Sequence, residues 1–139
     1  MRDIKNIVLH CTATPPNTTV ESILNYWKKV KGWTNPGYHF LIEASGKINN
    51  ILPIEEVSNG VRGHNSNSIH ISYIGGIDES GDAIDNRTPR QVLSQMQLLV
   101  ELNEKFPNAD ILGHRDFKGV TKACPSFDAR QFTKQIKLT

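Results

Sequence analysis

The chain has 139 residues, a length typical of one domain, and no repeat, low-complexity tract or linker divides it. We therefore expect a single domain over residues 1–139. Its content of 37% hydrophobic and 22% charged residues is ordinary for a globular protein. A net charge of +2 is too small to indicate a nucleic-acid partner, and no apolar run is long enough for membrane insertion.

The N-terminal segment reaches His10 before the apolar region of a signal peptide could be completed. The sequence therefore predicts synthesis in the cytoplasm without a signal peptide. Cys11 and Cys124 are the two cysteines and could in principle pair. Without an export signal, a metal-binding or catalytic role is the better expectation for at least one of them.

The first half of the chain predicts strands around one helix. Residues 7–11 form an apolar run typical of a buried strand, and its period of two places His10 and Cys11 on opposite faces. Thr18 followed by Glu21 predicts a helix start with a capping box. This helix should end near Gly32. Sequence patterns further predict strands at 38–42, 47–52, 69–74 and 109–112, with a loop at 55–68.

Two more helices are predicted in the second half. Thr88, Pro89 and Gln91 supply an N-cap, a proline at the first helical position and a capping glutamine. Asp128 can cap a last short helix. The residues expected to pack from these helices are Val92, Met96, Leu99, Val100 and Phe106, then Phe132 and Ile136. The order of elements predicts an α/β fold with a central mixed β-sheet flanked by helices.

Three residues could form a metal site. A catalytic zinc ion takes three protein ligands from histidine, cysteine or carboxylate and keeps one position open. His10 ends the first predicted strand, His114 follows the last one, and Cys124 lies in the loop beyond. The spacing alone leaves open the alternative of a buried thiol with two hydrogen-bonded strand histidines, because no short motif such as His-Glu-x-x-His is present.

Five segments in order carry a resemblance to a known family. They are residues 10–14 (HCTAT), 32–33 with 37–40 (GW and GYHF), 67–78, 113–116 (GHRD) and 122–128 (KACPSFD). Together they resemble the type-2 N-acetylmuramoyl-L-alanine amidases, the family of bacteriophage T7 lysozyme and the peptidoglycan recognition proteins. The resemblance covers nearly the whole chain, although the loop at Arg62 is shorter than in T7 lysozyme.

The resemblance implies roles for individual residues. His10, His114 and Cys124 stand at the family's ligands for Zn²⁺, and Tyr38 and Lys122 stand at its catalytic tyrosine and lysine. It implies hydrolysis of the amide between N-acetylmuramic acid and L-alanine of peptidoglycan, and a fold with a central mixed sheet. A monomer that acts on the cell wall after release or export is the corresponding expectation.

Other polar residues have weaker assignments. Arg62, His64 and Asn65 lie in the polar loop and could line a groove for the carboxylates of the peptide stem, for which the planar guanidinium is suited. A solvated loop is the alternative for all three.

The remaining histidines and one cysteine are expected to be structural. His39 alternates with Tyr38 and should point to the opposite face, as a structural or supporting group. His70 lies inside a predicted strand and receives no role. Cys11 is predicted to be a packed thiol.

Three other functions remain open at this stage. One is a binding module that recognises peptidoglycan without cutting it, against which Cys124 and Lys122 argue. Another is a cysteine hydrolase that uses Cys11 or Cys124 with a histidine. The last is an intracellular regulatory protein.

Overall fold

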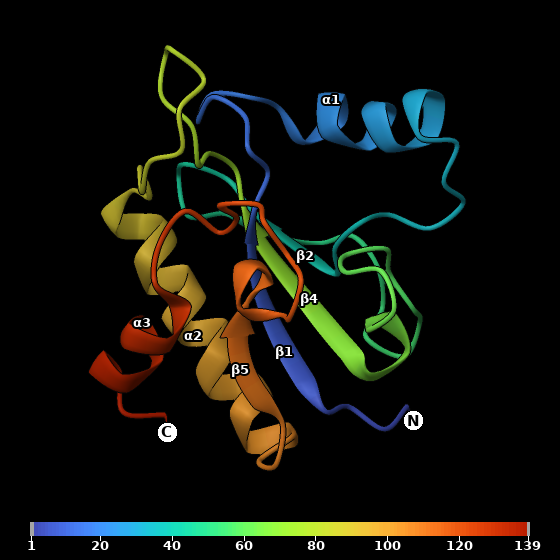
Figure 1. The fold of residues 1–139 in the computed structure, drawn as a ribbon, viewed down its shortest axis with the longest axis vertical. Helices are drawn as coiled ribbons and strands as arrows, with labels where there is room; N and C mark the ends of the chain where they lie inside the picture. Colours follow the sequence, from blue (N-terminus) through green and yellow to red (C-terminus); the bar gives the residue numbers. More distant parts are fainter. Residues whose placement is uncertain (1, 139) are drawn as a thin grey trace.

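The computed structural model describes residues 2–138 and has a central sheet with helices on both faces (Figure 1). In chain order its elements are β1 (Asn6–Cys11), α1 (Val20–Asn25) with a π-helical extension (Tyr26–Val30), β2 (Phe40–Ile42), β3 (Ile48–Asn50), a 3-10 turn (Asn65–Asn67), β4 (Ser68–Tyr73), α2 (Pro89–Lys105), β5 (Asp110–Gly113), a second 3-10 turn (His114–Asp116) and α3 (Ala129–Gln135). The predicted order of strands and helices is confirmed.

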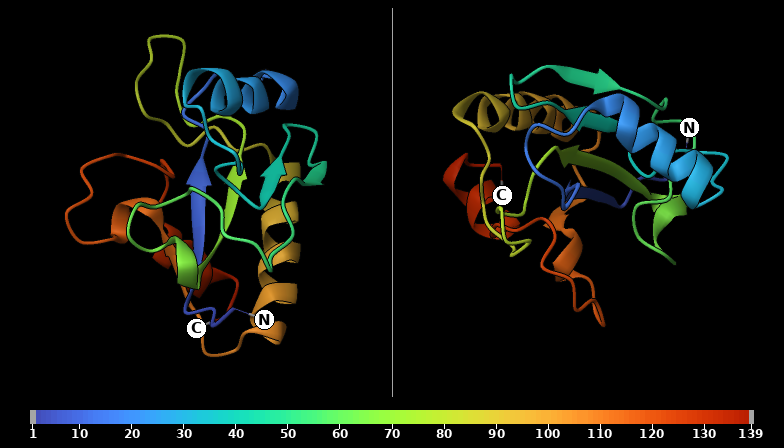
Figure 2. Two further views of the ribbon diagram at one scale, coloured as in Figure 1. Left: turned by 90° about the vertical axis from the view of Figure 1, so that its right-hand side faces the viewer. Right: turned by 90° about the horizontal axis from the view of Figure 1, so that it is seen from above.

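The sheet is mixed, with the strand order β3-β2-β4-β1-β5. β1 lies between β4 and β5 and is parallel to both, whereas β3 is antiparallel to β2 (Figure 2). Because β1 and β5 are parallel neighbours, their carboxyl ends meet at one edge of the sheet. His10 lies near the end of β1 and His114 directly follows β5, so the two histidines are brought together there.

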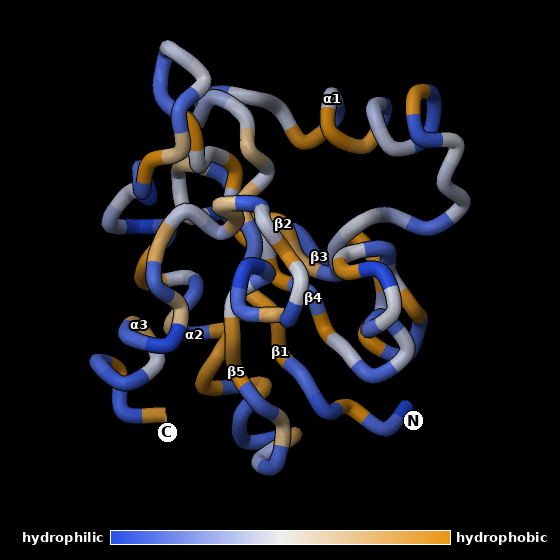
Figure 3. The backbone as a smooth tube through the Cα atoms, in the orientation of Figure 1, coloured by the Kyte–Doolittle hydropathy of each residue, from blue (hydrophilic) through white to orange (hydrophobic). Residues whose placement is uncertain are grey.

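One face of the sheet carries the main hydrophobic core. Ile7 and Leu9 of β1 are completely buried against residues of α2 and α3, including Leu99. Burying an aliphatic side chain of this size contributes roughly 1.5–3 kcal/mol. The tube in Figure 3 shows the apolar strands and the polar loops around them.

The other face of the sheet is covered by α1 and by the loops. Trp27 and Ile23 pack on Leu41 of β2, and Val8 of β1 packs with Leu112 in a separate cluster. His10 has the same parity along β1 as Val8 and lies on this second face, away from the core under α2 and α3. The prediction that Cys11 lies on the opposite face, as a packed thiol, is confirmed, because Cys11 belongs to the main core.

The helix starts agree with the sequence in two cases of three. Thr88 and Gln91 form the predicted capping box of α2, and the carboxylate of Asp128 accepts from a backbone N–H to cap α3. The prediction of Thr18 as the first cap is wrong: Thr19 accepts from a backbone N–H of α1. The Thr18 hydroxyl instead donates to a carbonyl in the preceding turn, so it is not available to cap.

Two further details of the sequence prediction are wrong. Val100 is 43% exposed, because it lies on the solvent side of α2 between the buried Leu99 and Leu102. β2 begins at Phe40 instead of residue 38, so Tyr38 precedes the strand. Within residues 2–138, none of the helices combines the length and the apolar character that a membrane crossing requires.

Candidate metal centre

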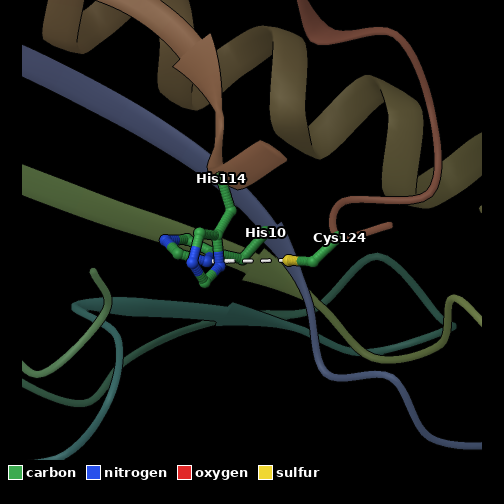
Figure 4. Close-up of side chains that lie close together, drawn as sticks. All are labelled: His10, His114 and Cys124. Carbon is green, nitrogen blue, oxygen red and sulfur yellow. Dashed lines mark hydrogen bonds between the residues drawn. The ribbon is translucent and has the colours of Figure 1, made fainter. Parts of the chain in front are cut away.

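Two histidines and a cysteine converge at the carboxyl edge of the sheet. His10 comes from β1, His114 directly follows β5, and Cys124 comes from the loop before α3 (Figure 4). Their ligating atoms all lie within 4.8 Å of one another, and Nδ1 of His10 is 3.7 Å from Sγ of Cys124. The three residues that the sequence proposed as ligands are therefore neighbours in space.

The donor set fits a zinc ion. Zinc binds imidazole nitrogen and thiolate at about 2.0–2.3 Å, so tetrahedral ligand atoms lie roughly 3–4 Å apart, close to the spacing here. Histidine must be neutral to bind a metal. Burial, together with the charge of Lys122, lowers the pKa of His114. Burial also lowers the pKa of His10, which is 1% exposed, well below its usual value, so both rings are held neutral.

The thiol of Cys124 is partly buried beside Cys11. The side-chain hydrogen bond with Cys11, together with burial, raises the pKa of Cys124. The backbone N–H of Cys11 also points at Sγ of Cys124, 3.3 Å away, and a donor in this position stabilises a thiolate. Binding of a metal ion would release the proton of Cys124, as is general for thiolate ligands.

The structure reveals a further residue at this site, His70 of β4. Its Nδ1 lies 2.8 Å from Nε2 of His10, and the ring is completely buried. In the sequence His70 had no assigned role. The available signal was the alternation in β4, where Ser68, His70 and Ser72 share one face and alternate with larger, mostly apolar side chains. Only the register of β4 against β1, which pairs Val8 with His70, brings this face beside His10.

The two proposed catalytic side chains line one cleft. A cavity of about 480 Å³ is lined by Tyr38, Lys122 and His114, among others, so one of the three candidate ligands borders it. The ring of Tyr38 lies 4.9 Å from that of His10, measured between centroids. Its hydroxyl donates to the carbonyl of Cys11 at 3.2 Å. Burial raises the pKa of Tyr38, so its phenol keeps the proton at neutral pH.

The three loop residues assigned to substrate binding lie in different places. Arg62 is exposed and lines the same cleft as Lys122. His64 packs its ring against Phe117, with centroids 4.5 Å apart. Asn65 directs its side-chain oxygen to His70 and to a backbone N–H within its own loop. Of the three, only Arg62 is among the residues that line this cleft.

His39 has the structural, supporting role that the sequence predicted, but the strand alternation from which its direction relative to Tyr38 was inferred does not exist here. Both residues precede β2, so strand alternation does not apply to them. The His39 ring is stacked on that of His70 with centroids 6.1 Å apart. Its Nδ1 accepts from the backbone N–H of His70, and its Nε2 lies 2.8 Å from the carbonyl oxygen of Glu56. His39 therefore braces the start of β4.

A mixed sheet that presents a His/His/Cys cluster beside an open cleft is the arrangement of a metal-dependent hydrolase. Residues 1–127 match the family model of N-acetylmuramoyl-L-alanine amidase, and the chain belongs to that family. The family is generally zinc-dependent, and the three clustered side chains could bind a metal ion. The protein is accordingly an amidase of the bond between N-acetylmuramic acid and L-alanine, as the sequence predicted.

Individual relatives agree with this assignment. The chain is 35% identical to the endolysin of Enterobacteria phage K11 over 138 residues, which cover 99% of this chain and 90% of that protein. It is 36% identical to the endolysin of Escherichia phage T7 over 133 residues, or 95% and 87% of the two chains. The solved amidase LysC of Clostridium intestinale superposes with a TM-score of 0.81 at 26% identity, covering 99% and 88%. The predictions of family, fold class and enzyme class are confirmed.

Proposed function

We propose that this protein is a zinc-dependent, endolysin-like amidase of the bacterial cell wall, with the metal held by His10, His114 and Cys124. The observation that carries the proposal is the convergence of these three ligand atoms within 4.8 Å of one another, next to the cleft lined by Tyr38 and Lys122. The endolysin names of the K11 and T7 relatives support the cell wall as its place of action.

A zinc ion bound there would supply Lewis acidity, which polarises a carbonyl and lowers the pKa of water to about 7. His10 and His114 would hold it as neutral ligands, for which their lowered pKa values are suited. Cys124 would bind as thiolate, stabilised by the backbone N–H of Cys11. Of the three residues that would hold the ion, His114 also lines the cleft in which the substrate would bind.

Lys122 and Tyr38 would act on the substrate. Attack on the amide carbonyl creates a negative charge on its oxygen, and the Lys122 side chain, which lines the cleft, would stabilise that charge. A donor aimed at such an oxyanion contributes roughly 3–4 kcal/mol. Tyr38 keeps its phenolic proton because burial raises its pKa, so it would donate a hydrogen bond to the oxyanion or a proton to the departing amine of L-alanine.

The peptide stem would lie along the cleft beside the metal. Arg62 lines it and offers a planar guanidinium to a stem carboxylate. His64 remains a candidate for contacts further along the loop, whereas the side-chain oxygen of Asn65 is engaged with His70 and with the backbone N–H of Val61. The protein would reach the wall after release from the cytoplasm or export, as a monomer.

Digestion of purified peptidoglycan, with the products identified by mass spectrometry, tests this function. We expect free stem peptides that begin with L-alanine. A metal chelator should abolish their release and added zinc should restore it. Activity that survives the chelator but not a thiol alkylator would instead indicate a cysteine hydrolase, and tight peptidoglycan binding without any product would indicate a binding module.

A further inference from the structure

The side-chain oxygen of Asn65 receives two hydrogen bonds. It accepts from the backbone N–H of Val61 at 2.8 Å, and it lies 2.9 Å from Nε2 of His70. A backbone N–H can only donate, so the atom that faces Val61 must be the amide oxygen. The same oxygen then requires a donor from His70. The backbone of the loop therefore fixes the proton of the His70 ring on Nε2.

The proton on Nε2 of His70 determines the state of the neighbouring ring. A neutral imidazole has one N–H, so Nδ1 of His70 carries a lone pair. This Nδ1 lies 2.8 Å from Nε2 of His10, which must therefore donate. The N–H of His10 is used in this contact, and its Nδ1 keeps the lone pair. That Nδ1 is the atom that lies 3.7 Å from Sγ of Cys124.

The opposite arrangement is unfavourable at both ends. If His70 carried its proton on Nδ1, its Nε2 lone pair would face the oxygen of Asn65, and two buried acceptors would be left in contact. A doubly protonated His70 would be a charge in the interior: the ring is completely buried, and within residues 2–138 it has no hydrogen bond to a carboxylate.

The His70 ring also has no freedom to turn away. Its backbone N–H is held by Nδ1 of His39, and the two rings are stacked at an angle of 6°. On another side Gly60 approaches so closely that a Cβ at this position would overlap the ring. The position of the ring, and with it the contact to His10, is thus fixed by His39, Gly60 and the hydrogen bond to Asn65.

We propose that Asn65 and His70 are positioning residues that lock His10 in the tautomer whose Nδ1 lone pair points at the metal. This proposal rests on the zinc site proposed above, and it assigns roles to two residues that touch neither metal nor substrate. In the other tautomer the N–H of His10 would point at the metal position and exclude the ion. Partners that orient a metal-bound histidine are typically worth ten- to a hundredfold in metal affinity.

The direct test is the protonation pattern of the histidine rings. Long-range ¹H–¹⁵N spectra of ¹⁵N-histidine-labelled enzyme, as purified and after dialysis against a chelator, report which ring nitrogen carries hydrogen. We expect the Nε2–H tautomer for both His10 and His70 in both samples. A His10 ring with its proton on Nδ1 in the metal-free sample would overturn the proposal.

Matched variants test the consequence for the metal. Leucine and asparagine have the same branching, but only asparagine retains an acceptor near the position of Nδ1 of His70. We expect His70→Leu to lose ten- to a hundredfold in zinc affinity, measured by competition with a chromophoric chelator, and His70→Asn to stay within about threefold of the wild type. Equal affinity of both variants would contradict the lock.

A second pair of variants tests the hydrogen bond between Asn65 and His70. Asn65→Ala removes the acceptor and should give a mixture of His10 tautomers and weaker zinc binding. Asn67→Ala is the control, since Asn67 lies in the same turn and, within residues 2–138, its side chain bonds only to Asp3 and Ser66. It should leave both readouts unchanged. An unaltered His10 spectrum in folded Asn65→Ala would contradict the proposal.

These measurements separate the positioning role of Asn65 and His70 from the proposed function. If zinc binds with the expected stoichiometry but the metal-free His10 ring has its proton on Nδ1, the positioning role is wrong and the zinc site stands. If the tautomers of His10 and His70 are as expected but the protein binds no zinc, the positioning role stands and the proposed metal site is wrong.

Discussion

Gly60 lies against the imidazole of His70 with no room for a side chain between them. Its backbone has no left-handed conformation, so the close approach is the reason that glycine is needed here. We expect Gly60→Ala to displace the ring and to lower the free energy of unfolding by about 1–3 kcal/mol, the usual cost of overpacking. Urea denaturation measures this. In a His70→Ala background the same change should cost little, and an undiminished cost there would show that the overlap is elsewhere.

The two cysteines should behave differently towards zinc. Cys124→Ser should lose most of the metal, because a neutral hydroxyl is a far poorer zinc ligand than a thiolate. Cys11→Ser should keep both metal and activity, because the backbone N–H that Cys11 directs at Sγ of Cys124 is retained and a serine hydroxyl can replace the hydrogen bond between the two side chains. Elemental analysis of the purified variants measures the zinc content. If the metal were lost only in Cys11→Ser, the assignment of Cys124 as the ligand would be wrong.

Lys122→Ala and Tyr38→Phe should fold and bind zinc normally but turn over slowly. If each side chain acts mainly on the transition state, kcat and kcat/KM should fall together, by at least about a hundredfold. The effects should be less than additive if the two share one proton-transfer network. Assays on peptidoglycan fragments at saturating concentration measure kcat. A Lys122→Ala enzyme with raised KM and unchanged kcat would restrict Lys122 to substrate attraction.

The metal-free protein should lose stability in mild acid. Burial lowers the pKa of His39 from 6.5 to about 4, although the carbonyl of Glu56 opposes the shift. Between pH 6.5 and about 4, His39 is protonated in the unfolded chain but neutral in the folded one. Its contribution to the free energy of unfolding is therefore complete above pH 6.5 and is lost as the pH falls towards 4.

One such group changes the free energy of unfolding by at most about 1.4 kcal/mol per pH unit. Urea denaturation at pH 7, 6 and 5 measures the slope, to which His10 and His70 contribute in the same direction. His39→Asn keeps an acceptor near the position of Nδ1 for the backbone N–H of His70 and should reduce the slope. If the slope in His39→Asn were identical to that of the wild type, His39 would not contribute to the pH dependence of stability.

The sequence by itself determined the family and the three candidate ligands. The segments around His10, His114 and Cys124 are short and local, so a resemblance can identify them without coordinates. Alternation along β1 also sufficed to separate His10 from Cys11, because the direction of side chains in a regular strand follows from the backbone alone. Local patterns were less reliable where the backbone departs from regularity. Tyr38 and His39 precede β2, and the first cap is Thr19 instead of Thr18.

Only the tertiary structure decided the surroundings of the ligands. His70 is sixty residues from His10 in the chain, and their contact depends on the parallel register of β4 against β1. In the sequence Asn65 is compatible with a solvated loop residue, whereas in the structure its side-chain oxygen is directed to His70. Hydrogen-bond partners of this kind are set by the packing of distant segments, which a local pattern does not encode. The kinds of side chain at the site can therefore be read from the sequence, whereas the hydrogen-bond partners of His10 are set by the fold.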